Sequence, residues 1–268
     1  MPFNEIFDRL WNDYSTRNPM VKKVHDLFTS EGESVVNDHI AIRTFRNPLI
    51  GIDQIALIFL KHNYELMGEY RFDQKKLFAK HYEHKSDKNA PRVFISELLV
   101  ESCSFYLQQV VKGWIHSIPF TEIKPDELIL AGNMSGMPSY TVYEKLRQES
   151  EYAAWLYING FRVNHFTVSI NDLKKYDTIQ KVNGFLKEKG FLMNDSGGEI
   201  QGSPEELLEQ SSVKAEMIPF QFTEGKYDAT GCYYEFARRY LDPNGELYNG
   251  FISKSADKLF ESTNFYKK

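Results

Sequence analysis

Apolar residues recur with helical spacing at the start of the chain. In residues 3–15 and 18–29 they fall every three or four positions, which places them on one side of a helix. The apolar positions are Phe3, Ile6, Phe7, Leu10 and Trp11, then Val21, Val24, Leu27 and Phe28. The pattern predicts two amphipathic helices ahead of the first strand.

The pattern then changes to the alternation of a strand. In residues 35–45 (VVNDHIAIRTF) one face carries His39, Ala41, Arg43 and Phe45, and the other carries Ile40, Ile42 and Thr44. Residues 52–62 have helical spacing again. Three extended segments follow at 64–72, 76–84 and 92–100. The predicted order is strand, helix, strand, strand, strand.

A helical stretch separates this unit from a second one. Residues 101–117 and 138–158 predict helices, the second closed by Gly160, and the Pro/Gly/Asn-rich residues 118–138 between them predict a loop. In residues 161–170 (FRVNHFTVSI) alternation resumes, with His165, Thr167 and Ser169 on one face.

The same element order then returns. A helix is predicted over residues 173–189, capped by Asn171 or Asp172 and ended by Gly190. Strands are predicted within 191–203, 213–225 and 230–241, together with a short helix at 204–210 (PEELLEQ) that Ser203 and Pro204 open.

The order β-α-β-β-β therefore occurs twice, at residues 35–100 and 161–241, with a helical insertion at 101–160. Each unit opens with a strand that carries a histidine, in DHIAI and in NHFTV. We expect an α+β fold in which two modules form one curved, barrel-like sheet with a concave interior, within a single domain over residues 1–268.

Composition narrows the class of protein. Of 268 residues, 42% are hydrophobic and 26% charged, as in a globular protein, and the net charge of -5 with no basic run argues against a nucleic-acid partner. The two cysteines, Cys103 and Cys232, form no disulfide framework. No secretory signal and no apolar run of membrane-spanning length is present. We expect a cytoplasmic protein without a membrane partner; its oligomeric state stays open.

Most of the seven histidines fit ordinary positions. His25, His62 and His116 lie on predicted helices as surface or core-edge residues. His81 and His84 are three residues apart in a highly charged segment, so they cannot share one face of a strand. A solvated hairpin is the favoured interpretation there, with a surface metal site as the alternative.

His39 and His165 stand apart because they occupy equivalent places in the two modules. The symmetry of the repeat would bring them together, and a carboxylate from a neighbouring strand is the expected third ligand. Glu235, in the aromatic segment GCYYEFARRY, is the best candidate, although a salt bridge to Arg238 or Arg239 would also explain it. Two imidazoles and one carboxylate suit divalent iron and leave coordination positions for substrate and oxygen.

Two further residues affect the choice of chemistry. Glu97 lies in the last strand of the first module, where we place it as the equivalent of Glu235 and hence as a possible fourth ligand. Arg43 follows His39 by four residues on the same strand face, about 13 Å away at ~3.3 Å per residue. A guanidinium there suits the far carboxylate of a short diacid, and a salt bridge at the rim of the barrel is the alternative.

Four motifs carry a resemblance to a known family. NDHIAIRTF, FRVNHFTVSI, EIQGSPEELLEQSS and YEFARRY occur in the order found in the family once called domain of unknown function 1338, now described as 2-oxoadipate dioxygenase/decarboxylase. The resemblance runs from about residue 35 to the C-terminus. It implies a fold similar to the vicinal oxygen chelate superfamily, which agrees with the paired modules.

The resemblance also implies roles for particular residues. His39, His165 and Glu235 would bind Fe(II), and Arg43 would hold a substrate carboxylate during catalysis. Gln201, Ser203 and residues 250–263 would help to line the pocket, although Gln201 could instead support the helix predicted at 204–210. The reaction implied is conversion of 2-oxoadipate and O2 to 2-hydroxyglutarate and CO2, a step of lysine catabolism.

Two other classes of function remain as alternatives. An isomerase or lyase of the same superfamily would use a redox-inert metal with four protein ligands, Glu97 among them. A non-catalytic protein that binds an oxo acid through Arg43 would not need the metal. A hydrolase lacks support because no G-x-S-x-G pattern is present.

Overall fold

The computed structural model describes residues 2–252. Its α-helices are α1 (Phe3–Arg17), α2 (Pro19–Ser30), α3 (Ile52–Lys61), α4 (Phe105–His116), α5 (Tyr140–Glu149), α6 (Glu151–Asn159) and α7 (Ile179–Glu188). Its strands are β1 (Asn37–Phe45), β2 (Tyr64–Phe72), β3 (Leu77–His84), β4 (Arg92–Leu98), β5 (Val163–Ser169), β6 (Gln201–Ser203), β7 (Leu208–Ser212), β8 (Met217–Phe222), β9 (Gly225–Thr230) and β10 (Glu235–Arg239).

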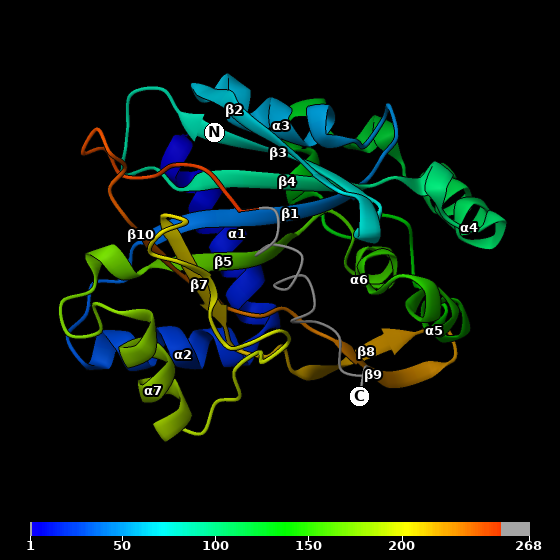
Figure 1. The fold of residues 1–268 in the computed structure, drawn as a ribbon. Helices are drawn as coiled ribbons and strands as arrows, with labels where there is room; N and C mark the ends of the chain where they lie inside the picture. Colours follow the sequence, from blue (N-terminus) through cyan, green and yellow to red (C-terminus); the bar gives the residue numbers. More distant parts are fainter. Residues whose placement is uncertain (1, 253–268) are drawn as a thin grey trace.

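Eight of the strands form one sheet, in the order β2-β3-β4-β1-β5-β10-β7-β6. Each half has the order β-α-β-β-β, and in each half the first strand lies parallel to the last, β1 to β4 and β5 to β10. The halves join where β1 pairs antiparallel with β5 in the middle of the sheet (Figure 1). The predicted α+β fold of two such modules is confirmed.

Helices cover one face of the central strands and leave the other for a cavity. Trp11 and Tyr14 of α1 pack on Phe166 of β5, with ring centroids 5.1 Å apart in both pairs. Phe166 alternates with His165, so α1 lies on the face away from that histidine. The insertion helices α4, α5 and α6 gather beside one end of β1 and β5 (Figure 1), and α6 contacts β1.

A separate hairpin interrupts the second module. β8 and β9 pair with each other and not with the main sheet. The hairpin fastens to α5, because Glu224 in its turn accepts hydrogen bonds from the Tyr140 amide (2.7 Å) and the Ser139 hydroxyl (2.6 Å). The Tyr227 ring stacks on that of Tyr140 at 4.0 Å. The strand predicted within 213–225 is therefore β8, outside the main sheet.

The single helix predicted over 138–158 is wrong in one respect, because the chain breaks at Ser150 into α5 and α6. Ser150 has an extended backbone and its hydroxyl accepts a hydrogen bond from the Ala153 amide, which caps α6. The helix predicted from residue 173 begins only at Ile179, capped by Thr178. The Asn171 side chain instead bonds the backbone N–H and carbonyl of Arg239, at 2.9 Å each.

The helix predicted at 204–210 is wrong. The Ser203 hydroxyl accepts from the Glu206 amide at 3.2 Å, as in a helix start, but Leu207 has a φ of +64° and ends the turn. Residues from Leu208 onward form β7, which pairs with β6 on one edge and β10 on the other. Pairing on both edges satisfies the backbone and buries Leu208 and Gln210, which a surface helix would not do.

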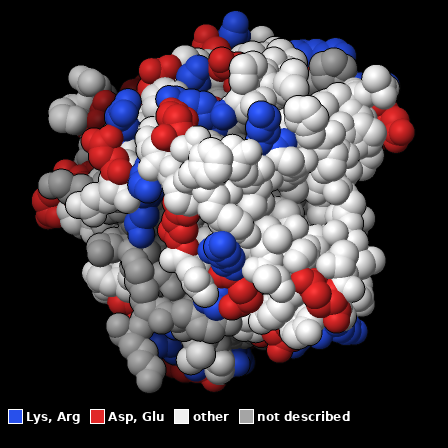
Figure 2. All heavy atoms as spheres, turned by 90° about the vertical axis from the view of Figure 1, so that its right-hand side faces the viewer, with Lys and Arg blue, Asp and Glu red and all other residues white. Residues whose placement is uncertain are grey.

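The surface carries no marked excess of one charge on the face shown in Figure 2, where Lys and Arg are interspersed with Asp and Glu. This agrees with the small net charge of -5. None of the helices within residues 2–252 has the length and apolar character that crossing a bilayer would require.

Candidate metal centre

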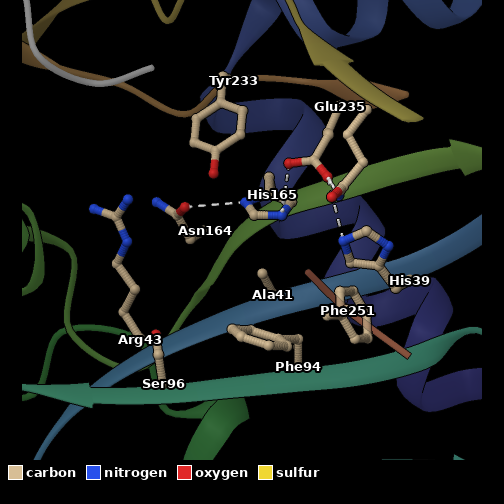
Figure 3. A pocket seen from close by; sticks show the side chains of 11 residues that line it. His39, Ala41, Arg43, Phe94, Ser96, Asn164, His165, Tyr233, Glu235 and Phe251 are labelled. Atoms are coloured by element: carbon tan, nitrogen blue, oxygen red, sulfur yellow. Dashed lines mark hydrogen bonds and ion pairs between the residues drawn. The ribbon is translucent and has the colours of Figure 1, made fainter. Parts of the chain in front are cut away.

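Three side chains from neighbouring central strands converge on one point. His39 of β1, His165 of β5 and Glu235 of β10 each offer a ligand atom, and these atoms lie within 4.8 Å of one another. Glu235 Oε1 is 3.5 Å from His39 Nε2, and its Oε2 is 3.3 Å from His165 Nε2 (Figure 3). All three residues are buried. Such a group could hold a metal ion.

The sheet register explains why these side chains meet. On β5, Thr167 is the ladder partner of His39 on one side and of Glu235 on the other. His165 lies two residues before Thr167 and faces the same way. Thr167 Oγ1 is also 3.1 Å from His39 Nε2. The three candidate ligands thus come from strands that the fold holds side by side.

A β-bulge precedes each histidine. His39 is paired with Thr167 and Asn37 with Val168, so Asp38 is an extra residue on β1. Likewise Ala41 pairs with His165 and Ile42 with Val163, so Asn164 is an extra residue on β5.

Each of the two bulged residues bonds the ring of the histidine that follows it. Asp38 Oδ1 lies 2.7 Å from His39 Nδ1, and Asn164 Oδ1 lies 3.2 Å from His165 Nδ1. Each bond fixes the ring and leaves Nε2 toward Glu235.

Asp38 carries a buried charge that the fold compensates. Arg239 binds it through Nε (2.6 Å) and Nη2 (2.9 Å), and Arg92 lies 3.5 Å away. Burial alone would raise the pKa of the Asp38 carboxyl, but Arg239 and the hydrogen bond from His39 hold it well below its usual range. Asp38 is therefore an anion that orients His39.

The two histidines differ in their affinity for a proton. Burial lowers the pKa of His165 well below its ordinary value, and the charges of His39 and Arg43 act in the same direction. Burial also disfavours the charged form of His39, but its bonds to Asp38 and Glu235 raise its pKa. Because a metal binds the unprotonated ring, metal binding meets less competition from protons at His165 than at His39.

Gln210 is a site residue that the sequence interpretation missed. It lies on β7, buried, and its Nε2 donates to Glu235 Oε1 at 2.5 Å. This bond leaves Glu235 Oε2 free to turn toward His165. Local signals in residues 204–210 predict a helix, in which Gln210 would have no fixed relation to Glu235, so the sequence alone does not reveal this contact.

Arg43 lies on the same face of β1 as His39 and is 2% exposed. Its guanidinium lies over the rings of Tyr152 and Trp155 from α6, at 5.0 and 5.3 Å from the ring centroids. Among the described residues, its Nε and Nη1 have no hydrogen-bond partner. A buried cation with two unused donors could bind an anion.

A pocket joins Arg43 to the candidate ligands. Its lining residues are His39, Ala41, Arg43, Phe94, Ser96, Asn164, His165, Gln210, Tyr233, Glu235 and Phe251 (Figure 3). Phe251 packs edge-on against His39, with ring centroids 4.9 Å apart. Its segment is held by Arg239 Nη1, which donates to the Gly250 carbonyl at 2.8 Å. One end of the cavity is polar and cationic, and the wall beside His39 is aromatic.

Glu97 does not join the ligands. In the β1–β4 register it pairs with Thr44 and faces outward, where it binds Arg46 Nε (2.8 Å) and the Ile52 amide at the start of α3 (3.2 Å). Placing it as the equivalent of Glu235 was wrong. Two residues after His39 the partner on β4 is Phe94, just as Glu235 is the partner two residues after His165.

Gln201 and Ser203 lie outside the set of residues that lines this cavity. Gln201 Nε2 donates to the carbonyls of Ser196 (3.3 Å) and Gly198 (2.6 Å), so it holds its own loop together. Ser203 is engaged in the turn before β7. Of the predicted lining segment 250–263, Phe251 lines the cavity, and residues 253–263 lie outside the described residues.

The prediction of a solvated hairpin around His81 is wrong for that residue. His81 is buried, with Nδ1 2.9 Å from the Tyr70 hydroxyl and Nε2 3.1 Å from Glu83. His84 points elsewhere and accepts hydrogen bonds from the amides of Ser86 and Asp87. The two histidines do not form a common metal site.

The fold and the site together define a class of protein. Two β-α-β-β-β modules form one curled sheet, and two equivalent histidines meet a carboxylate at its centre beside a cationic pocket. The paired modules are similar in fold to the vicinal oxygen chelate superfamily, and the three converging residues could hold a metal ion. A glyoxalase superfamily protein from Ralstonia eutropha shares this fold, at a TM-score of 0.74 and 23% identity over 91% of this chain and 83% of that one.

Comparison with known families gives a narrower assignment. The family model described as 2-oxoadipate dioxygenase/decarboxylase matches residues 6–118 and 130–246. The chain belongs to the 2-oxoadipate dioxygenase/decarboxylase family, and it is an enzyme of the dioxygenase/decarboxylase type.

Individual relatives agree with this assignment. The chain is 36% identical to the chloroplastic 2-oxoadipate dioxygenase/decarboxylase of Arabidopsis thaliana, over 97% of this chain and 77% of that protein. The crystal structure of a hydroxyglutarate synthase from Oryza sativa, in complex with 2-oxoadipate, is similar with a TM-score of 0.91. It is 33% identical and covers 98% of this chain, and this chain covers 92% of it.

Proposed function

We propose that this protein binds Fe(II) through His39, His165 and Glu235 and converts 2-oxoadipate and O2 to 2-hydroxyglutarate and CO2. The observation that carries the proposal is one pocket with three convergent ligand atoms at one end and, at the other, the Arg43 guanidinium, whose Nε and Nη1 lack partners among the described residues. A short diacid with an oxo group at one end has the two functional groups that these ends would recognise.

The donor set fits divalent iron. Two imidazoles and one carboxylate on one face are typical of non-haem iron sites that activate oxygen, because they leave positions for substrate and O2. Bound there, iron would supply the redox chemistry that joins the oxidation of the 2-oxo acid to the reduction of O2. The hydrogen bonds from His39 to Asp38 and from His165 to Asn164 hold both Nε2 atoms ready for a cation.

Arg43 would bind the carboxylate farthest from the reacting carbons. Its rigid position between two aromatic rings of α6 and the strand spacing of about 13 Å from His39 set the length of substrate that reaches both ends. A buried guanidinium binds a carboxylate through two parallel hydrogen bonds. This residue would therefore orient the chain and select a diacid over a monoacid.

The aromatic walls would keep water away from the reacting end. Phe94 and Phe251 line the cavity beside the candidate ligands, 4.9 Å apart between ring centroids. A dry site strengthens the bond between Arg43 and an anion and protects reactive oxygen species from side reactions.

The lyase alternative loses support at the fourth position. A four-ligand site would need a donor on β4 at the place equivalent to Glu235, and Phe94, which has none, occupies it. A protein that only bound an oxo acid through Arg43 would not need two histidines and Glu235 buried around one point. That alternative therefore does not account for these three residues. The cytoplasmic location and the place in lysine catabolism stay predictions.

Oxygen uptake tests the proposal. Protein loaded anaerobically with Fe(II) is mixed with aerated 2-oxoadipate, with 2-oxoglutarate in parallel. We expect O2 consumption matched one-to-one by CO2 and a 2-hydroxy diacid, and faster turnover of the longer acid. No uptake with either acid despite bound iron would refute the dioxygenase assignment.

A further inference from the structure

We infer that Asn164 donates a hydrogen bond to the same substrate carboxylate that Arg43 binds, and that it selects diacids together with Arg43. The inference rests on the proposed function, because it concerns the recognition of that substrate. Four observations on Asn164 support it, and each comes from a different feature of the site.

The first observation is an unused donor. Asn164 is 1% exposed and lines the cavity, yet its Nδ2 has no hydrogen-bond partner among the described residues. Buried polar groups in folded proteins almost always find a partner. An amide donor that faces a cavity without one indicates that a ligand supplies the acceptor.

The second observation fixes which end of the amide faces the cavity. Nε2 of His165 points at Glu235 and is the candidate ligand atom, so Nδ1 is the ring nitrogen that carries the proton. Nδ1 can then only donate, and the atom 3.2 Å from it must be the Asn164 oxygen. The NH2 group is therefore the part of the side chain left to meet the ligand.

The third observation is the place of this donor. Figure 3 shows the Asn164 amide between the guanidinium of Arg43 and the ring of His165, with its nitrogen on the side of Arg43. Nε and Nη1 of Arg43 are also unpaired. Three buried N–H donor atoms around one part of the cavity suit an acceptor with two oxygens, and the charge of Arg43 makes that acceptor an anion.

The fourth observation is an asymmetry between the two modules. Asp38 and Asn164 are the equivalent bulged residues, and each orients a histidine through an oxygen. The second oxygen of Asp38 is bound by Arg239, so that pair is closed to ligands. A carboxylate at position 164 would form the same closed pair with Arg43. The neutral amide keeps Arg43 available and adds a donor beside it.

The residue would thus act at both ends of the site. Its oxygen positions His165 as a ligand, and its nitrogen binds the substrate. Binding of the diacid would order the amide that holds His165, so the correct substrate would also stabilise the geometry of the metal ligand.

The Asn164→Asp variant separates the two roles. Aspartate keeps the oxygen that accepts from His165, as Asp38 does for His39, but it lacks the donor and adds a negative charge beside Arg43. We expect metal content close to that of the wild type. Asn164→Ala removes both groups without adding charge, so we expect loss of the diacid preference and weaker metal retention as well.

The measurement is substrate binding by calorimetry on Fe(II)-loaded protein under nitrogen, where no turnover occurs. 2-Oxoadipate is compared with 2-oxohexanoate, which has the same chain and no distal carboxylate. We expect the wild type to prefer the diacid, and Asn164→Asp to reduce the ratio of the two affinities by about 10- to 100-fold, the range for a hydrogen bond to a charged group. Affinity for 2-oxohexanoate should change little.

The outcomes distinguish this inference from the proposed function. An unchanged preference in both variants would overturn the role of Asn164, even if the wild type consumes O2 with 2-oxoadipate. An equal fall in affinity for both acids would show a structural role only and would also overturn it. A wild type that prefers the diacid under nitrogen but consumes no O2 would refute the proposed reaction and leave the carboxylate site standing.

Discussion

Replacing Asp38 by asparagine tests whether the buried ion pair of Asp38 and Arg239 stabilises the fold and orients His39. The substitution keeps the size of the side chain and removes one negative charge. Arg239, whose side chain is 1% exposed, would lose its charged partner and keep only neutral acceptors, among them the backbone carbonyls of Tyr248 and Gly250. His39 would lose the anion that orients it.

The expected magnitude follows from the burial of the pair. Breaking a buried, doubly hydrogen-bonded ion pair by removing one charge destabilises a protein by about 3–5 kcal/mol, because the other charge stays buried. The pKa of Asp38 lies well below its usual range in the folded protein, so this stability is present above about pH 4. It is lost as the pH falls through the folded-state pKa, and the variant and the wild type should converge in acid.

Urea unfolding of metal-free protein at pH 7 measures the effect. Asp26→Asn is the matched control, since Asp26 pairs with Lys22 at 2.6 Å but both side chains are more than half exposed. We expect the control to lose less than about 1 kcal/mol. The Asp38→Asn variant should also bind the metal about 10- to 100-fold more weakly, because His39 is no longer held by an anion.

A double-mutant cycle decides whether the pair is responsible. Adding Arg239→Met to Asp38→Asn should destabilise the protein by clearly less than the sum of the single changes, because no unpaired charge remains. A loss below about 1 kcal/mol for Asp38→Asn, or strict additivity in the cycle, would refute the reasoning about this buried network.

Two other substitutions separate supporting residues from candidate ligands, and a third tests the buried carboxyl group of Glu151. Gln210→Met removes the donor to Glu235, and we expect about 10- to 100-fold weaker metal affinity in a chelator competition; unchanged affinity would contradict a positioning role. Glu97→Gln should leave metal content unchanged and weaken only the bonds to Arg46 and to the start of α3 at Ile52; loss of metal would restore the four-ligand alternative. Burial raises the pKa of Glu151 from 4.5 to about 7. Between these pH values the Glu151 carboxyl is protonated in the folded state and ionised in the unfolded state. The free energy of unfolding should therefore fall by up to about 3 kcal/mol as the pH rises from 4.5 to 7, and Glu151→Gln should abolish that fall in melting temperatures at pH 5 and 8.

Strand periodicity pointed to His39, His165 and Arg43, and the cost of a charge in an aromatic segment pointed to Glu235. His39 and His165 share an alternation face with small or polar residues, and that face proved to be the interior of the curled sheet. The repeat of the element order then placed the two histidines together, as the pairing of β1 with β5 shows. In a regular strand, the alternation of the sequence is enough to show which side chains share a face.

Irregular backbone explains what the sequence did not predict. Asn164 precedes His165, so regular alternation assigns it to the opposite face, and only the bulge turns it into the cavity. Asp38 was missed for the same reason. A bulge depends on pairing with a distant strand, which local spacing does not reveal.

Tertiary pairing also overrode local helix signals. The sequence Ser-Pro-Glu-Glu begins like a helix, but Leu208–Gln210 gain more from pairing with β6 and β10 than from one exposed turn. The equivalence of Glu97 with Glu235 was wrong because the β1–β4 register, which the sequence of one strand does not reveal, places Phe94 opposite Ala41.

Oxygen isotope labelling tests the central claim most directly. When 2-oxoadipate loses C1 as CO2, two of its five oxygens leave, so both atoms of O2 are needed to complete the five oxygens of 2-hydroxyglutarate. Protein loaded with Fe(II) and supplied with 18O2 and 2-oxoadipate is predicted to release 2-hydroxyglutarate that carries heavy oxygen from both atoms. The product should be absent from the Glu235→Gln variant, which lacks the carboxylate ligand. Product that contains no heavy oxygen, or that forms equally well without O2, would contradict the account.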